Sequence, residues 1–147
     1  MPLTKPTINI ENVVASASIN QKVNLIEITK KFNNVEYHPK RFPGLVFRIK
    51  SPKTATLIFS SGKMVCTGAK SAELSKKAVK TVVSELRKKG IKIKKNAIIK
   101  IQNMVASVDL GGQINLEEAA RRLNQCMYEP EQFPGLIYRM NEPKTVI

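Results

Sequence analysis

The chain carries one stretch of sequence twice, first as Ile8-Asn9-Ile10-Glu11-Asn12-Val13-Val14-Ala15-Ser16 and again as Ile99-Lys100-Ile101-Gln102-Asn103-Met104-Val105-Ala106-Ser107. A second stretch, Phe42-Pro43-Gly44-Leu45, returns as Phe133-Pro134-Gly135-Leu136 at the same offset, since 103 − 12 = 91 and 133 − 42 = 91. Without gaps, residues 8–56 and 99–147 are identical at 20 of 49 positions, far above the level of unrelated sequences. A duplicated unit constrains the whole architecture, so we predict two copies of one structural unit.

Each copy begins with a strand followed by a short helix. Asn24 is placed to cap that helix, with Glu27 three residues further on, and Asn115 and Glu118 repeat the arrangement. In the first copy, period-2 patterns then predict strands around residues 34–37, 45–50, 54–59 and 63–67. Turn residues separate them at Phe42-Pro43-Gly44 and Ser60-Ser61-Gly62.

A long helix closes the first copy. We expect it to begin at Ser71, to run to Lys89 and to end at Gly90. Its inward-facing stripe is predicted to consist of Leu74, Ala78, Val79, Val82, Val83 and Leu86. The mixed order of strands and helices predicts an α+β fold in which helices cover one face of a sheet.

The second copy stops before the first one does. The counterparts of Leu57, Phe59 and the long helix would fall beyond Ile147, so we expect an N-terminal tail at 1–7, a first repeat at 8–97 and a truncated second repeat at 98–147. A half-unit without two strands and its helix leaves sheet edges and apolar surface unprotected. We therefore expect poor stability if this is the real polypeptide, and we favour a fragment.

Composition limits the function classes. The 147 residues include 25 Lys+Arg against 11 Asp+Glu, a formal net charge of +14, and 42% are hydrophobic. This length allows one domain or two small halves with a core, and it excludes a large multidomain enzyme. The charge makes polyanions the first partner class to consider.

Cysteine and histidine usage argues against metal and disulfide chemistry. Cys66 and Cys126 form no CxxC pair, and His38 is the single histidine. We therefore expect no disulfide framework, no metal site and no cofactor. The apolar runs are too short to span a bilayer and the N-terminus lacks the apolar core of a signal peptide, so we expect a soluble intracellular protein without a membrane partner.

The predicted strands leave one sheet face apolar where a solvated face is normally polar. In the first strand Val13, Ala15 and Ala17 point one way, and Asn12, Val14 and Ser16 point the other. The same alternation sets Leu57 and Phe59 against Thr56 and Ile58, and Val65 and Thr67 against Met64 and Cys66. A weakly polar face edged by Arg41, Arg48, Lys53 and Lys63 suits the floor of a DNA minor groove. The alternative is a strand buried on both faces in a larger core.

Over nearly its whole length the sequence resembles the TATA-box-binding protein family. The residues that carry the resemblance are Glu11–Ser16, Tyr37–Leu45, Leu57–Lys70 and Tyr128–Arg139. Phe-Pro-Gly-Leu in both repeats is more similar to archaeal members than to eukaryotic ones. The resemblance implies a saddle in which two pseudo-symmetric repeats share one curved antiparallel sheet, with helices on the convex face. It implies a location in the cytoplasm or nucleoid for an archaeal protein, or in the nucleus for a eukaryotic one.

The resemblance also implies a function and a set of DNA-binding residues. The protein would be a general transcription initiation factor that binds the minor groove of an A/T-rich TATA element and bends it by inserting phenylalanines. Phe42, Phe59 and Phe133 would be the wedges, and Asn12, Asn103 and Thr67 would donate hydrogen bonds to bases. Val14, Leu57, Val65 and Val105 would line the groove, and Arg48 and Arg139 would hold phosphates. From composition alone, core aromatics would be the favoured interpretation of these phenylalanines.

A further set of residues would bind protein partners. By resemblance, Glu129, Glu131 and Gln132 form a surface that docks transcription factor B, whose recruitment leads to RNA polymerase. Solvated turn carboxylates are the alternative interpretation. The basic residues of the long helix and its exit would add general electrostatic attraction, meet other proteins, or simply be solvated: Lys76, Lys77, Lys80, Arg87, Lys88, Lys89, Lys92, Lys94 and Lys95.

Two functions of other classes stay open. One is a fragment of a saddle-fold nucleic-acid enzyme, since fold does not fix function. The sequence offers no second histidine, nucleophile elbow or phosphate loop for it, and Ser61-Gly62-Lys63 lacks the spacing of a P-loop. We therefore do not expect an enzyme. The other is a protein-interaction scaffold with no role in DNA binding.

Overall fold

The computed structural model describes residues 5–147, so residues 1–4 of the expected N-terminal tail lie outside it. The chain forms two compact units. The first unit comprises Ile8–Val108, and the second comprises Asp109–Ile147 together with residues 5–7. In the described residues, no helix is long and apolar enough to cross a membrane.

The first unit is built on a six-stranded sheet with the order β2-β3-β4-β5-β1-β6. The strands are β1 (Thr7–Ser18), β2 (Val35–Glu36), β3 (Leu45–Lys50), β4 (Lys53–Ile58), β5 (Lys63–Ala69) and β6 (Ile98–Asp109). The pairings β2–β3, β3–β4, β4–β5 and β5–β1 are antiparallel. The strands predicted from the period-2 patterns are thus all present, although β2 is shorter than expected.

Two helices complete the first unit, α1 (Leu25–Lys31) and α2 (Ala72–Lys88). The Asn24 side chain accepts hydrogen bonds from the backbone N–H groups of Ile26 and Glu27, which caps α1 as predicted. Ser71 caps α2 by accepting from the Leu74 N–H at 3.0 Å. Gly90 follows the helix with a φ of +88°, a conformation that favours glycine, so the helix ends where the sequence predicted.

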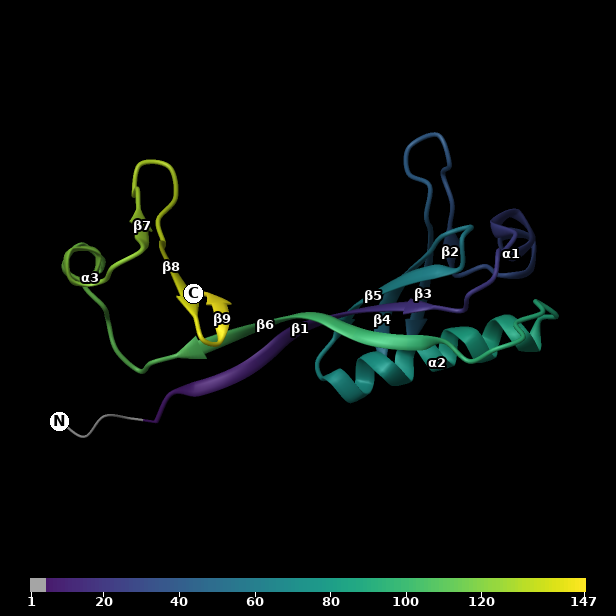
Figure 1. Ribbon diagram of the computed structural model, residues 1–147, viewed down its shortest axis with the longest axis horizontal. Helices are drawn as coiled ribbons and strands as arrows, with labels where there is room; N and C mark the ends of the chain where they lie inside the picture. Colours follow the sequence, from purple (N-terminus) through teal and green to yellow (C-terminus); the bar gives the residue numbers. More distant parts are fainter. Residues whose placement is uncertain (1–4) are drawn as a thin grey trace. The chain divides into compact units, whose positions relative to one another are not determined.

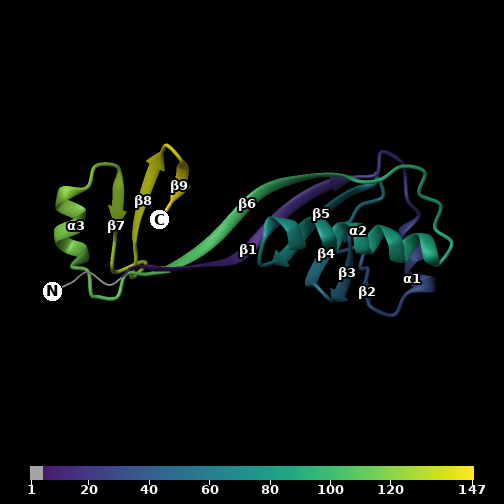
Figure 2. The same cartoon turned by 90° about the horizontal axis from the view of Figure 1, so that it is seen from below.

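One face of the sheet is covered by α2, which packs against β3, β4 and β5 (Figures 1 and 2). The buried core lies between this face and the helices and includes Ile28, Phe47, Met64, Val82 and Leu86. Cys66 is also buried there, and burial raises the pKa of its thiol.

The prediction for the inward face of α2 was wrong at one position. Leu74 is 38% exposed, and its neighbour Ser75 is buried instead. The buried line runs through Ser75, Val79, Val82 and Leu86, which lie three or four residues apart. Leu74 is one residue, or about 100°, away from the start of that line, so it lies at the margin of the stripe.

The second unit contains α3 (Leu116–Arg122), β7 (Cys126–Tyr128), β8 (Leu136–Asn141) and β9 (Lys144–Val146). The three strands form an antiparallel sheet in the order β7-β8-β9. Asn115 caps α3 by accepting from the Glu118 N–H at 3.1 Å, as the repeat predicted. In contrast to the first unit, no residue from 109 to 147 is buried.

Candidate nucleic-acid interface

The face of the first-unit sheet opposite α2 is open. Val46 pairs with Leu57, Leu57 with Val65, and Val65 with Ser16, so these four residues form a row across β3, β4, β5 and β1. All four are half-buried, whereas their chain neighbours Phe47, Ile58, Met64 and Ala17 are buried. Because side chains alternate along a strand, the row lies on the face away from the core. The predicted alternation is confirmed, and these strands are not buried on both faces.

A second row adds polar groups to this face. Arg48 pairs with Ala55, and Ala55 pairs with Thr67. The Thr67 hydroxyl lies 3.0 Å from the Asn12 side-chain nitrogen, which brings the predicted base-contacting residues Asn12 and Thr67 together. The open face is therefore apolar along one row as far as Ser16, and it carries one amide, one hydroxyl and one guanidinium along the next.

A hydrogen bond from the backbone also holds the Asn12 amide. The Gly68 N–H donates to the Asn12 Oδ1 at 2.7 Å, and Gly68 adopts a φ of +103°. Gly68 was not among the site residues predicted from the sequence. The signal available for Gly68 was its place as a glycine within the Leu57–Lys70 motif, because a backbone position with positive φ favours glycine.

Two aromatic rings meet at the turn between β2 and β3. The rings of Phe42 and Phe59 lie 5.9 Å apart at an interplanar angle of 70°, an edge-to-face arrangement. Phe42 is 43% exposed and Phe59 is half-buried, so neither ring belongs to the core. A Cβ added to Gly44 would lie 2.7 Å from the Phe42 ring and 3.1 Å from the Phe59 ring. Only glycine therefore leaves room for both rings here.

Basic side chains surround two hollows of the first unit. One, of about 900 Å³, is lined by Asn12, Arg48, Thr67 and the lysines Lys50, Lys53 and Lys70. The other, of about 860 Å³, is lined by Phe59, Val65, Lys63 and Lys100 among others. Arg48 also forms an ion pair with Glu36 at 3.3 Å, and both side chains are exposed. Since such exposed pairs are weak, Arg48 stays available to an anionic ligand.

The predicted residues of β6 also belong to the first unit. Asn103 is exposed, and Val105 is 48% exposed. Two side-chain hydrogen bonds join β6 to β1: Gln102 donates to Ser16 at 2.7 Å, and Ser107 donates to Glu11 at 2.8 Å. The Ser107 hydrogen bond and the nearby Lys70 charge lower the pKa of Glu11.

The second unit holds the remaining predicted residues. Phe133 is 56% exposed and lies over Gly135, where an added Cβ would be 2.7 Å from its ring. Arg139, on β8, pairs with Val146 and is exposed. Glu129, Glu131 and Gln132 are exposed on the turn before Phe133, and the Glu129 carbonyl accepts hydrogen bonds from the backbone N–H groups of Gln132 and Phe133.

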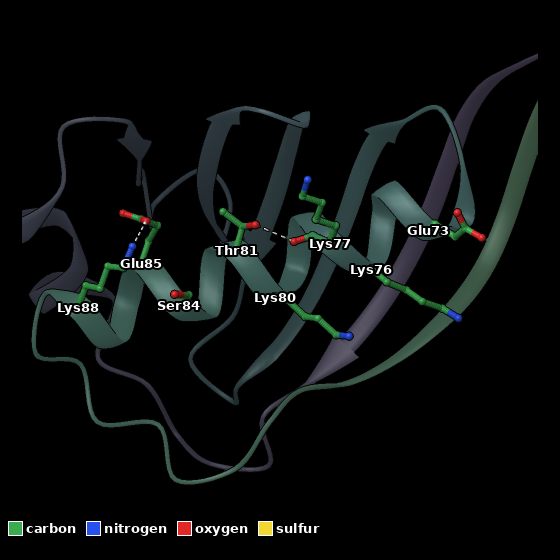
Figure 3. Close-up of a pocket in the computed structure, with 8 residues that line it drawn as sticks. All are labelled: Glu73, Lys76, Lys77, Lys80, Thr81, Ser84, Glu85 and Lys88. Carbon is green, nitrogen blue, oxygen red and sulfur yellow. Dashed lines mark hydrogen bonds and ion pairs between the residues drawn. The ribbon is translucent and has the colours of Figure 1, made fainter.

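The outer side of α2 forms a separate basic surface, shown in Figure 3. A hollow of about 640 Å³ there is lined by Lys76, Lys77, Lys80 and Lys88, with Thr81 and Ser84 between them. Lys88 pairs with Glu85 at 3.3 Å. This surface and the open face lie on opposite sides of the sheet. Within residues 5–147, no group of three or more His, Cys, Asp or Glu side chains is placed to hold a metal ion.

The comparisons with known proteins concern almost the entire chain. Residues 7–89 and 98–147 match the family model described as transcription factor TFIID (or TATA-binding protein, TBP). The TATA-box-binding protein of Pyrodictium occultum is 53% identical over 143 residues, 97% of this chain and 72% of the relative. That of Methanocaldococcus jannaschii is 49% identical over 147 residues, all of this chain and 80% of the relative.

A solved structure, Methanococcus jannaschii TBP, matches with a TM-score of 0.84 and 50% identity, covering 95% of this chain and 79% of that one. This match confirms the α+β fold class expected from the sequence. Together, the family model, the identity to the relatives and the structural match show that the chain belongs to the TATA-box-binding protein family.

Proposed function

We propose that the protein is a general transcription initiation factor that binds the minor groove of an A/T-rich TATA element in promoter DNA. The observation that carries the proposal is the open sheet face of the first unit, which is largely apolar, weakly polar at one row and bordered by the exposed Phe42 ring and the half-buried Phe59 ring. Membership of the TATA-box-binding protein family supports it.

The chemistry of the open face fits a minor groove better than it fits exposed phosphates or a major groove. The row through Val46, Leu57 and Val65 offers apolar contact to sugars and base edges, with few donors. The minor groove of A·T pairs displays only acceptors, so a few donors such as those of Asn12 and Thr67 suffice. A major groove would require a richer pattern of donors and acceptors to read its bases.

We propose that Phe42 and Phe59, and Phe133 in the second unit, act as wedges that bend the DNA. Insertion of apolar side chains between base steps is a known mode of this family. Unstacking a step costs a few kcal/mol, which a buried ring and the added contacts of a bent duplex offset. The edge-to-face contact of Phe42 with Phe59 restricts both rings before DNA arrives, so less entropy is lost on insertion.

Arg48 and Arg139 are proposed to bind phosphates at the border of the interface. The formal charge of +14 gives a general attraction to DNA that falls as salt rises. The lysines on the outer side of α2 face away from the proposed groove, so their contribution is to the overall field. Replacing Arg48 by Gln should lower the slope of log K against log salt by about 1.

We propose that the second unit binds the protein partner. Glu129, Glu131 and Gln132 lie exposed on one turn, where the first repeat has His38, Lys40 and Arg41. We propose that this turn binds transcription factor B, which recruits RNA polymerase. The repeats 8–97 and 98–147 would then differ in role, because only the second would carry the protein-binding turn. The protein would act in the cytoplasm at the nucleoid. No catalytic step forms part of the proposal, and nicking and glycosylase assays should detect no turnover.

Gel-shift competition tests the proposed DNA binding. The protein should bind a TATA duplex more tightly than a G/C-rich duplex of equal length, by about ten-fold or more, since each mismatched pair costs about 1–3 kcal/mol. Energy transfer between dyes at the ends of the TATA duplex should rise on binding, because bending brings the ends together. Equal affinity for both duplexes would instead favour a protein-interaction scaffold.

A further inference from the structure

The amide of Asn12 has a fixed orientation. A backbone N–H can only donate, so the atom of Asn12 that lies 2.7 Å from the Gly68 nitrogen must be the carbonyl oxygen Oδ1. The amide nitrogen therefore lies on the other side of the group. Asn12 bonds to Thr67, which pairs with Ala55 in the second row of the open face, and this contact places the amide on the candidate interface.

Counting hydrogens shows what this arrangement offers to a ligand. Asn12 carries two N–H groups and Thr67 carries one O–H, three polar hydrogens in all. The Asn12 Nδ2 donates to the Thr67 Oγ1 at 3.0 Å, and the Thr67 hydroxyl in turn lies within donating distance of the Asn12 Oδ1, at 3.2 Å. The second N–H of Asn12 is left to donate to a ligand, while the amide oxygen accepts from the Gly68 N–H and faces the Thr67 hydroxyl. The pair is therefore strongly biased towards donating.

Only glycine can hold the amide in this way. Gly68 has a φ of +103°, which side chains of L-residues rarely adopt. A Cβ there would also lie 3.3 Å from the Lys53 carbonyl oxygen and 3.5 Å from the Thr54 Cα. Any other residue must shift the backbone of β5, and that shift moves the N–H away from Asn12.

We propose that Gly68 is a positioning residue that sets base-pair discrimination, because it keeps Asn12 in the donor orientation. This inference rests on the proposed binding to the minor groove. An A·T pair presents two acceptors there, and a G·C pair adds the guanine amino group, which is a donor. When Gly68 holds the Asn12 amide, the Asn12 N–H faces the guanine amino group, so that two donors meet. The Asn12 oxygen cannot turn to accept a hydrogen bond from that amino group. Without Gly68 the amide is free to flip and to accept from guanine.

The test measures affinity on three sets of duplexes. Each A·T pair of a TATA element is replaced in turn by G·C or by inosine·cytosine, which lacks the amino group and resembles A·T in the minor groove. For the wild-type protein, the pair that lies under Asn12 should tolerate inosine·cytosine and reject G·C by about ten-fold or more. In Gly68→Ala, the ratio between inosine·cytosine and G·C at that pair should fall by about five-fold, the equivalent of one hydrogen bond.

A second variant removes the N–H without adding a side chain. Replacing Gly68 by glycolic acid converts the Thr67–Gly68 amide into an ester, whose oxygen repels the Asn12 Oδ1 and favours the flipped amide. This variant decides the matter if Gly68→Ala does not fold. Gly112→Ala is the matched control, because an added Cβ there meets nothing within 4 Å, and its ratio should equal that of the wild type.

The outcomes separate the two proposals. If the folded ester variant loses affinity equally on all three duplexes with an unchanged ratio, Gly68 is only structural and the inference fails, while binding to the minor groove stands. If the wild-type protein binds TATA and G/C-rich duplexes equally well, the proposed function itself fails.

Discussion

The turns that carry Phe42 and Phe133 are built alike but supported differently. The His38 carbonyl accepts hydrogen bonds from the N–H groups of Arg41 and Phe42, and the Glu129 carbonyl accepts from those of Gln132 and Phe133. Each ring lies over the glycine two residues later. Phe42, however, also contacts Phe59, whereas Phe133 contacts no aromatic ring in the described part of the chain. The turn sequence thus positions one ring by itself, and the adjoining hairpin β4–β5 supplies the second.

The largest expected difference between the repeats concerns stability. Leu25 and Leu116 begin α1 and α3 at equivalent positions, but Leu25 is buried and Leu116 is only half-buried. Leu25→Ala should lower the free energy of unfolding by about 2–5 kcal/mol, because it leaves a cavity in a packed core. Leu116→Ala should cost about 1 kcal/mol or less, since water fills the space. Urea unfolding followed by circular dichroism checks both, and equal losses would contradict the comparison.

The next effect concerns the wedges. Phe42→Ala should weaken binding to a TATA duplex by about 1–3 kcal/mol, the range for loss of one base–aromatic contact, and should reduce the bend. Phe133→Ala should have a smaller effect, because Phe133 lacks a neighbouring ring that restricts it before binding. Gel shifts give the affinity and energy transfer between end-labelled dyes gives the bend.

Two controls make the wedge prediction decisive. Phe32→Leu alters a buried ring of the core cluster, so it should lower stability without a selective loss of bending. The melting temperature of Phe42→Ala should stay near that of the wild type, since the ring is exposed. Unchanged energy transfer in Phe42→Ala at saturating protein would remove Phe42 from the set of wedges.

Gly44→Ala and Gly135→Ala sharpen the comparison further. An added Cβ would collide with the nearby ring at 2.7 Å in both turns. In the first turn Phe59 blocks the ring's retreat, so Gly44→Ala should cost about 1 kcal/mol or more in DNA affinity, as overpacking does. In the second turn Phe133 can swing into solvent, so Gly135→Ala should cost only a few tenths of a kcal/mol in affinity. Equal costs would mean that Phe59 does not restrict Phe42.

Much of this fold was predictable from the sequence because the same local patterns occur in both copies of the repeat. The caps at Asn24 and Asn115 and the alternation along residues 12–17 obey local rules, and the structure confirms them. Leu74 was assigned to the buried stripe, although it lies at its margin, because helical periodicity alone does not locate the centre of that stripe. Only the sheet beneath the helix fixes that centre, and it selects Ser75.

The candidate interface was predictable in its members but not in their contacts. The open face followed from the alternation of Val14, Leu57 and Val65 with buried neighbours. The contact of Gly68 with Asn12 joins residues 56 positions apart. It depends on the register of β1 against β5 and on the irregularity between Val13 and Ala15, which no local pattern encodes.

The strands β1 and β6 are joined by two equivalent hydrogen bonds that differ in charge. Ser107 donates to the Glu11 carboxylate at 2.8 Å, and the Gln102 amide donates to Ser16 at 2.7 Å. The offset of 91 relates Glu11 to Gln102 and Ser16 to Ser107. One copy of this contact is therefore titratable and the other is not.

The smallest expected effect is on this titration. The pKa of Glu11 lies below its ordinary value of 4.5, chiefly because of the Ser107 hydrogen bond and then because of Lys70. A lowered pKa means that the stabilising contribution is present above about pH 4.5 and is lost as the pH falls through the folded-state value. Ser107→Ala should move the Glu11 pKa up towards 4.5, and the carboxyl carbon chemical shift measured by NMR across pH 2–6 reports it. Ser16→Ala, which breaks only the neutral contact, should leave the Glu11 pKa in place, because its partner Gln102 carries no charge. An equal upward shift in both variants would mean that the link between β1 and β6 acts on Glu11 through strand position rather than through the Ser107 hydroxyl.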